Sequence, residues 1–387
     1  MPQKRPAPRS PVVALLIETS NAFSRELLHG VRNWMRAHAG WTIHLSEQGR
    51  GNKPPAWLKQ WRGDGIIARI ETPEIARAVK ACGVPVVNVS ASGLAPEFPA
   101  VISDSAEIAR LAARHLLERG FSNFAYCGDG RFVWSRSHGR HFAGVCSEAG
   151  HSCENFPTAG EEQEQARIQK WLQKLPKPIG IMACYDIRGQ QVLDACRALG
   201  LRVPDEVAVI SQHNDELLCE LCYPALSSVI PGAREIGAKA AAMLDQLMRG
   251  KRRHPAITTV PPLGIATRPS TDTVAVADAD AGLAVAVRHL RDHACEPLLI
   301  DDLAHLAGMS RTRLERLFRE HFGVSPYEQA LRHRMTRAEL LLRTTSLSIH
   351  EIAERTGFAT VEHFSNTFKK RMCRSPGALR RRRDVTQ

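Results

Sequence analysis

The sequence predicts a multidomain protein in which a two-lobed α/β half is followed by an all-α half. From residue 11 to about residue 268, short β-branched apolar runs alternate with stretches of helical length, a pattern typical of parallel sheets with crossover helices. From residue 283 onward the strand-like runs are replaced by helical patterns broken at glycines. With 387 residues, the chain is long enough for two or three domains that each bury a core.

The elements of the first half follow from its apolar patterning. Apolar runs predict strands at 12–17, 65–68, 84–89, 124–127, 179–184 and 207–210. Amphipathic stretches predict helices at 25–37, 105–119, 142–149, 188–199 and 233–249. The span of about 258 residues is enough for two lobes.

Residues 271–282, rich in Ala, Val and Asp, are predicted to be a linker. The expected domains are therefore residues 11–270 and 283–387. The second is broken at Gly308, 323–326, Gly357 and 375–377, where glycine and proline favour turns. We expect helices between these breaks, including a long one from Pro326 to Leu342.

Two segments of the second half, about fifty residues apart, share one pattern. The matching pairs are Leu303-Ala304 with Ile352-Ala353, Gly308 with Gly357, Phe318 with Phe368, and Ser325-Pro326 with Ser375-Pro376. In each segment a short amphipathic helix ends near the glycine, and a second helix begins after Ser310 or Thr360, which are good N-cap residues. This repeat predicts two helix-turn-helix units.

The second helix of such a unit presents its exposed face to the major groove of DNA. Its outward positions are predicted to be Arg311, Thr312, Glu315 and Arg316 in the first unit, and Thr360, Val361, Glu362, His363 and Asn366 in the second. Arginine can read guanine and asparagine can read adenine. The basic residues that follow suit phosphate contacts; they are Lys369, Lys370, Arg371, Arg374 and residues 380–383.

The charge of the chain agrees with a nucleic-acid partner. The formal net charge is +12, and residues 281–387 hold 19 Lys and Arg against 12 Asp and Glu, so +7 lies in that part. Basic domains bind nucleic acid by neutralising phosphates and releasing counterions. A solvated basic surface without a partner is the alternative reading of charge alone.

The segment from about residue 283 to residue 383 resembles the AraC/XylS domain. The resemblance is carried by residues 357–376, with Gly-Phe, His-Phe, Phe-Lys-Lys and the final Ser-Pro. It implies a double helix-turn-helix domain that binds a double-stranded DNA operator through two successive major grooves. It also implies a homodimer, and contact with RNA polymerase if the protein is an activator. An all-α domain that binds a protein through its basic face is the alternative.

The first half resembles the sensor fold of LacI-type repressors and periplasmic binding proteins. The matching segments are residues 23–30, 101–104, 204–210 and 225–229. In this fold a small molecule lies between two lobes, at the carboxyl ends of the strands. The predicted ligand-binding residues are Asn21, Arg25, Asp104, Trp134, Arg136, Asp186, His213, Asn214 and Asp215. Each could instead be a surface or capping residue, and Asp104 and Asp186 stand just before predicted helices.

The resemblance implies a sugar as the small-molecule effector, with D-xylose as the leading candidate. Charged groups bind hydroxyls strongly, and the Trp134 ring can cover the apolar face of a sugar. Two departures affect this expectation, because His213 stands where the family usually has Asp, and His138 where it often has Arg. Another pentose or a small polyol therefore remains open.

Other functions find little support in the sequence. It contains no phosphate-binding glycine loop and no hydrolase or metalloprotease motif, so we expect neither an enzyme nor a cofactor. A zinc site is not expected, because Cys219 and Cys222 are the only close cysteine pair, and a DNA-repair methyltransferase would need more clustered cysteines. The apolar run at 12–17 is too short for a signal peptide or membrane span, which favours a cytoplasmic regulator over an exported binding protein. Whether it activates or represses transcription stays open.

Overall fold

The computed structural model describes residues 10–38, 40–49, 51–157, 163–250, 256–272, 281–345, 347–372 and 374–385. The chain divides into two compact units, residues 1–271 and 272–387, which are described separately. The predicted linker falls at this division. Its residues 273–280 lie outside the described residues, and Ala281 and Gly282 belong to helix α9 (Ala281–His293), so the linker ends earlier than predicted.

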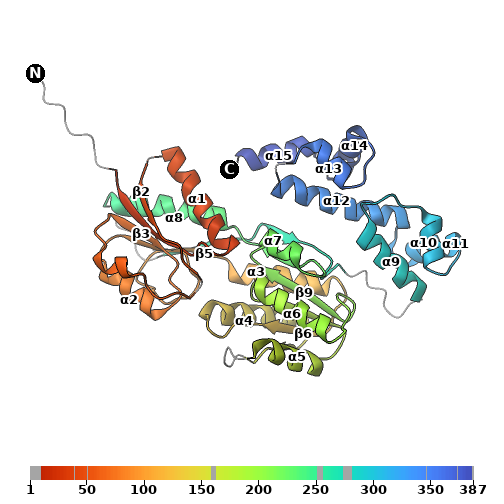
Figure 1. Ribbon diagram of the computed structural model, residues 1–387, viewed down its shortest axis with the longest axis horizontal. Helices are drawn as coiled ribbons and strands as arrows, with labels where there is room; N and C mark the ends of the chain where they lie inside the picture. Colours follow the sequence, from red (N-terminus) through yellow and green to blue (C-terminus); the bar gives the residue numbers. More distant parts are fainter. Residues whose placement is uncertain are drawn as a thin grey trace, which may run out of the picture. The chain divides into compact units, whose positions relative to one another are not determined.

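The first lobe of unit 1 is a parallel sheet with helices on both faces (Figure 1). Its strands are β1 (Val12–Leu16), β2 (Thr42–Leu45), β3 (Gly65–Ala68), β4 (Val86–Asn88), β5 (Ala100–Ser103) and β11 (Ile257–Val260). They lie in the order β11-β5-β4-β3-β1-β2, and every pairing is parallel. Its helices are α1 (Ala22–His38), the 3-10 helix η1 (Ala56–Gln60), α2 (Pro73–Ala81) and α8 (Ala233–Met248).

The second lobe repeats this plan. Its strands are β6 (Phe124–Cys127), β7 (Cys153–Asn155), β8 (Ile179–Ala183), β9 (Val207–Gln212), β10 (Ser227–Ile230) and β12 (Gly264–Ala266). They lie in the order β12-β10-β9-β8-β6-β7, and only the edge pairing of β10 with β12 is antiparallel. Its helices are α3 (Ser105–Leu117), α4 (Val133–Glu148), α5 (Glu164–Lys174), α6 (Asp186–Ala198) and α7 (Glu216–Leu221).

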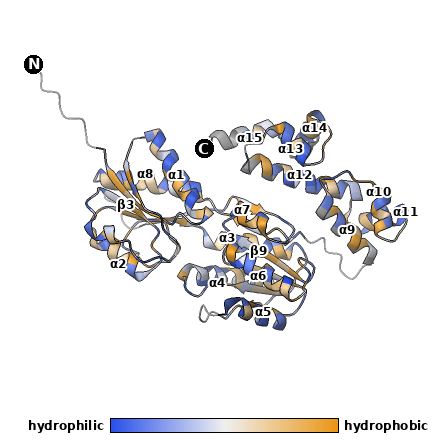
Figure 2. Ribbon diagram, viewed as in Figure 1, coloured by the Kyte–Doolittle hydropathy of each residue, from blue (hydrophilic) through white to orange (hydrophobic). Residues whose placement is uncertain are grey.

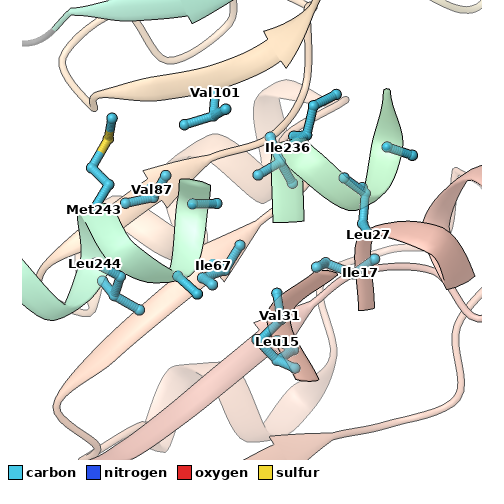
Figure 3. Packing of buried hydrophobic residues seen from close by; sticks show 14 of the residues in the cluster. Leu15, Ile17, Leu27, Val31, Ile67, Val87, Val101, Ile236, Met243 and Leu244 are labelled. Carbon is cyan, nitrogen blue, oxygen red and sulfur yellow. The ribbon is translucent and has the colours of Figure 1, made fainter. Parts of the chain in front are cut away.

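The core of the first lobe follows from the two-residue period of its strands. Leu15 and Ile17 face a cluster that contains residues of α1 and α8, whereas Ala14 and Leu16 face a cluster that contains residues of α2 and η1. Figure 3 shows Ile17 near Leu27 and Leu15 near Val31, both of α1. In Figure 2 the hydrophobic colour is concentrated in the strands, whereas the helices carry both hydrophobic and hydrophilic colours. Successive side chains of a strand point to opposite faces, so a continuous apolar run becomes a strand buried on both sides.

Helices α1 and α8 approach each other closely, and glycines make this possible. A Cβ atom on Gly237 would lie 2.0 Å from the carbonyl oxygen of Leu27, and one on Gly30 would lie 2.0 Å from that of Arg234. No side chain fits at either position, because these distances are far below van der Waals contact.

Three segments connect the lobes of unit 1: β5 to α3, β10 to α8, and β11 to β12. The crossovers are joined by backbone hydrogen bonds, since the Asp104 N–H donates to the Val260 carbonyl at 2.9 Å and the Leu263 N–H to the Ile230 carbonyl at 2.8 Å. The carboxyl ends of β5 and β10 therefore lie where the two lobes meet.

The structure contains elements beyond those predicted and corrects the start of one helix. Helix α4 begins at Val133 instead of residue 142, so Trp134, Arg136 and His138 lie on a helix and not in a loop. Helices α2, α5 and α7, the 3-10 helix η1 and the short strands β2, β5, β7, β10, β11 and β12 were not predicted. Each of these strands has three or four residues, too few for a clear alternating pattern.

Unit 2 is helical in its described residues. After α9, its helices are α10 (Ile300–Leu306), α11 (Arg311–Phe322), α12 (Pro326–Thr344), α13 (Ile349–Arg355), α14 (Val361–Met372) and α15 (Pro376–Val385). They form two separate hydrophobic cores, one around Phe318 and one around Phe364. Nowhere in the described ranges is a helix long and apolar enough to cross a lipid bilayer.

Candidate functional site

The two lobes of unit 1 enclose a small cavity between the carboxyl ends of their strands. It is lined by Phe23, Arg69, Glu71, Val89, Ser90, Ala91, Ser103, Ser105, Ile108, Trp134, His138, Gln212, His213 and Pro231. Its volume is about 30 Å³, which is room for only one or two water molecules. In this conformation, side chains from both lobes fill most of the space between them.

A buried ion network forms the wall on the first lobe. The Arg69 guanidinium lies 2.8 Å from a carboxylate oxygen of Glu18 and 2.7 Å from one of Glu71. Ser24 donates its hydroxyl to Glu18 at 2.8 Å and lies 3.1 Å from Arg69. Burial alone would lower the pKa of Arg69, but Glu18 and Glu71 outweigh it and raise that pKa. Arg69 is therefore a fixed cation, and its carbon Cζ lies 5.0 Å from the centre of the Phe23 ring.

A neutral polar network forms the wall on the second lobe. The Gln212 amide nitrogen lies 2.7 Å from His138 Nδ1 and 2.7 Å from the Cys184 carbonyl oxygen. Because Gln212 donates to Nδ1, the other ring nitrogen carries the hydrogen and donates to the Ser105 hydroxyl at 2.8 Å. Burial, with a smaller contribution from His141, lowers the pKa of His138 to about 4. His138 is therefore neutral at pH 7.

An aromatic stack spans the cavity from one lobe to the other. The His213 ring lies 4.9 Å from the Phe23 ring at an interplanar angle of 28°, and 6.3 Å from the Trp134 ring. The backbone places it there in a rare conformation, because His213 has φ +101° and Asn214 has φ +49°. Non-glycine residues with such angles cost free energy and concentrate at functional sites. The imidazole thus contacts aromatic rings of both lobes at the wall of the cavity.

An exposed ion pair closes the same gap at its rim. Arg25 of α1 lies 3.4 Å from the Asp215 carboxylate of the second lobe, and Arg25 also donates to the Thr19 carbonyl. Asp215 caps α7, and its backbone N–H donates to Asp186 at 2.7 Å. An exposed pair of this kind contributes about 0.2–1 kcal/mol, so it biases the lobes toward closure without locking them.

Asp186 supports the 213–215 turn through hydrogen bonds. It is buried and accepts hydrogen bonds from the hydroxyls of Ser211 and Ser228 at 2.6 and 2.7 Å, in addition to the Asp215 N–H. Burial raises the pKa of Asp186, although these hydrogen bonds oppose the shift. Asp186 therefore joins β9, β10 and the 213–215 turn.

The predicted ligand-binding residues divide into two groups. Trp134 and His213 line the cavity. The other seven do not line it: Asn21 caps α1, Asp104 caps α3, Arg136 is exposed and donates to the Gly130 carbonyl, Asn214 accepts from Arg268, and Arg25, Asp186 and Asp215 form the rim and its support. Their part in ligand binding stays a prediction.

The predicted site residues did not include Arg69, Glu71 or Gln212. A signal was present, because Arg69 directly follows β3 and Gln212 is the last residue of β9. Charged or amide side chains at the carboxyl end of a buried parallel strand meet at one sheet edge. His138 was singled out for its identity alone, and the structure places it on the cavity wall.

Each helix pair of unit 2 has the local features of a helix-turn-helix. Gly308 and Gly357 have φ +65° and +75° at the two turns. Ser310 accepts the Arg313 N–H at the start of α11, and Thr360 accepts the His363 N–H at the start of α14. The second helix of each pair therefore begins where the sequence predicted.

The outward face of α11 carries paired charges. Arg311 lies 3.0 Å from Glu315 and 3.3 Å from Asp301, and Arg316 lies 2.9 Å from Glu320. Thr312 is also exposed. Exposed pairs at this spacing contribute only about 0.3–0.5 kcal/mol, so the arginines can exchange these partners for base edges.

The outward face of α14 differs from that of α11. Glu362, His363, Asn366, Lys369 and Lys370 are exposed, as is Thr360 at its N-cap. Val361 instead packs partly against the core, which corrects its predicted outward position. Arg371 pairs with Glu328 of α12, and Arg380 donates to the Leu347 carbonyl, so both bind within the protein. The side chains of residues 381–383 lie outside the described part of the chain.

Comparison with known proteins agrees with this two-part organisation. Residues 12–104 match the family described as XylR N-terminal domain, residues 113–271 a periplasmic binding protein-like domain, and residues 303–382 a helix-turn-helix domain. The xylose operon regulatory protein of Escherichia coli K12 is 31% identical over 95% of this chain and 96% of its own length. The chain belongs to the family of xylose operon regulatory proteins.

Further relatives of this family support the assignment. The xylose operon regulatory protein of Haemophilus influenzae is 28% identical over 95% of this chain and 97% of its own length. The solved structure of a xylose-binding transcription activator, XylR, matches 98% of this chain and 99% of its own, with a TM-score of 0.69 and 28% identity. The chain is thus a transcription regulator of the xylose operon regulatory protein family, with a helix-turn-helix DNA-binding unit and a periplasmic-binding-protein-like unit.

Proposed function

We propose that unit 1 senses a small polyhydroxylated effector, with D-xylose as the leading candidate, and that the effector controls operator binding by unit 2. The observation that carries the proposal is the cavity, where aromatic rings and hydrogen-bonding groups from both lobes meet. The relatives named for the xylose operon support the same effector.

The chemistry of the cavity suits a sugar ring. The Phe23 and Trp134 rings offer apolar faces for the C–H groups of the sugar. Arg69 and Gln212 offer charged and amide groups for its hydroxyls, and hydrogen bonds to charged groups are the stronger kind. A polar ligand that both lobes contact would hold them together.

Entry of a sugar requires the cavity to grow. A volume of about 30 Å³ holds water but not a pentose. The His213 ring between Phe23 and Trp134 must therefore move, or the lobes must separate. Because the His213 turn is held by backbone angles that cost free energy, its rearrangement is the step we expect the effector to drive.

Regulation follows if the effector prefers one arrangement of the lobes. Its effect on DNA binding is limited by its difference in affinity for the two states. We propose that the protein acts as a homodimer on a double-stranded operator, and that as an activator it contacts RNA polymerase. A related sugar or polyol replaces D-xylose in this scheme if His213 changes the specificity of the cleft.

A thermal-shift panel of pentoses, hexoses and polyols tests the effector. A ligand that binds only the folded state raises the melting temperature of unit 1. We expect a rise with D-xylose or one closely related sugar, and an accompanying change in operator affinity. A panel without any rise, or a rise without a change in operator affinity, would contradict the proposal.

A further inference from the structure

The two helix-turn-helix units of unit 2 have independent cores. Helix α12 contributes Ala330 to the first core, whereas Met335, Ala338 and Leu342 belong to the second. Two small cores that share one helix do not by themselves hold their recognition helices at one separation. Contacts at the boundary between Ala330 and Met335 therefore contribute to the rigidity of the pair.

Arg334 occupies this boundary. Its side chain is 9% exposed, and its three guanidinium nitrogens donate to three backbone carbonyls. Nε lies 2.6 Å from the Ala294 oxygen and Nη2 lies 2.8 Å from the Glu296 oxygen, both just after α9 of the first unit. Nη1 lies 2.7 Å from the Gly357 oxygen, in the turn of the second unit. One side chain thus joins α12 to both units.

Gly357, whose carbonyl accepts from Arg334, provides a second contact at the same place. A Cβ atom there would lie 2.4 Å from the Cys295 carbonyl oxygen, which follows α9. The turn of the second unit therefore rests on the backbone next to the first unit. Gly308, the matching turn of the first unit, has a similar φ of +65° but nothing within 4 Å of such a Cβ atom.

We propose that Arg334, with Gly357, fixes the two helix-turn-helix units at one separation, so that the protein accepts DNA sites of one spacing only. A guanidinium is a rigid planar fork with donors in several directions, so it can bind all three carbonyls at once. Lysine keeps the charge but has its donors on one nitrogen, whereas Arg334 uses a separate nitrogen for each of the three carbonyls. Arg334 is a positioning residue, because its three nitrogens donate to backbone carbonyls of the protein.

The inference rests on DNA binding by unit 2, and its test separates the two claims. DNA sites are first enriched from a random library with the full-length wild-type chain, and the two sub-sites are mapped by base substitution. Affinity is then measured on the best site and on the same site with one base pair inserted between the sub-sites. The readout is the ratio of the two affinities for wild type, Arg334→Lys, Gly357→Ala and the control Gly308→Ala.

The expected ratios differ between the variants. Wild type and Gly308→Ala should lose about 100-fold in affinity on the insertion, because one recognition helix leaves its bases. Arg334→Lys and Gly357→Ala should lose less than about tenfold, because their units can shift to follow the DNA. General destabilisation would weaken binding to both sites and leave the ratio unchanged, and circular dichroism checks that the helices are folded.

The outcomes are distinct. Ratios for Arg334→Lys and Gly357→Ala that equal the wild-type ratio would overturn the role of this junction. A reduced ratio in Gly308→Ala would show that strain at a turn is enough, and would also overturn it. Failure to enrich any sequence would contradict the DNA-binding function itself. If Arg334→Lys does not fold, Gly357→Ala alone decides.

Discussion

The buried His138 imidazole should make unit 1 sensitive to acid. Its pKa is lowered from 6.5 to about 4 in the folded protein by burial and by His141. Between these values the unfolded chain binds a proton that the folded chain does not, so stability rises with pH. The stability that the neutral His138 ring contributes is fully present above pH 6.5 and is lost as the pH falls from 6.5 toward 4.

The size of this effect follows from the shift. One pKa unit corresponds to about 1.4 kcal/mol, so the whole shift is worth about 3 kcal/mol, of which about 2 kcal/mol is lost by pH 5. His138→Gln removes the titrating ring while its amide can still contact Ser105 and Gln212. Wild type should therefore lose about 2 kcal/mol more than His138→Gln between pH 7 and pH 5.

Urea unfolding followed by tryptophan fluorescence measures this difference in the intact chain. All six tryptophans, at positions 34, 41, 57, 61, 134 and 171, lie in unit 1, so the signal reports that unit alone. The exposed neighbour His141→Gln is the control; because it removes only the smaller cause of the shift, it should keep most of the acid sensitivity of the wild type. Parallel pH profiles for wild type and His138→Gln would refute the reasoning.

Three further predictions concern the ion network, the packing of helices and the DNA-binding surface. Arg69→Met leaves two buried carboxylates without their cation, so it should lower the free energy of unfolding in urea at pH 7 by about 3–5 kcal/mol. A loss below about 1 kcal/mol would contradict the role of the network. Gly237→Ala should lower the free energy of unfolding by about 1–3 kcal/mol through its backbone clash. Gly144, exposed on α4 with open space around it, is the control, and Gly144→Ala should raise that free energy by about 0.5–1 kcal/mol. Equal effects would disprove the close approach of α1 and α8. Arg316→Ala should relax sequence preference by about 1–3 kcal/mol, while Lys369→Ala should weaken all DNA alike and reduce the salt slope by about 1; the reverse pattern would exchange their roles.

Much of the fold could be predicted because its signals are local. The run at 12–17 is apolar at every position, and it became β1, buried on both faces. Helix α12 was expected from Ser325 and Pro326, and the structure shows Ser325 as its N-cap and Pro326 in its first turn. Caps, turns and long apolar periods depend on neighbouring residues only.

The start of α4 could not be predicted, because no local signal in the sequence marks it. Its N-cap is Phe132, which makes no capping hydrogen bond with its side chain, and its first residues include valine, tryptophan and two serines, which are weak helix formers. Packing of Trp134 and Phe142 in the second-lobe core stabilises this helix instead. Tertiary contacts of this kind leave no local mark in the sequence.

The composition of the cavity also depends on long-range contacts. Arg69 pairs with Glu18, which lies 51 positions earlier in the chain, and Gln212 pairs with His138, 74 positions earlier. In the sequence, Arg69 and Glu71 resemble solvated charges at the end of a strand. Only the order of strands in each sheet brings them to the space between the lobes.

We expect the cleft around Phe23 to bind a sugar. The direct measurement is a calorimetric titration, into three proteins, of the sugar that gives the largest thermal shift. They are wild type, Phe23→Ala, and Phe156→Ala, which truncates a buried ring that packs on Trp171 outside the cavity. We expect equal affinity for wild type and Phe156→Ala, and an affinity at least about tenfold weaker for Phe23→Ala, a change of about 1.4 kcal/mol. Binding to Phe23→Ala as tight as to the wild type would contradict this expectation.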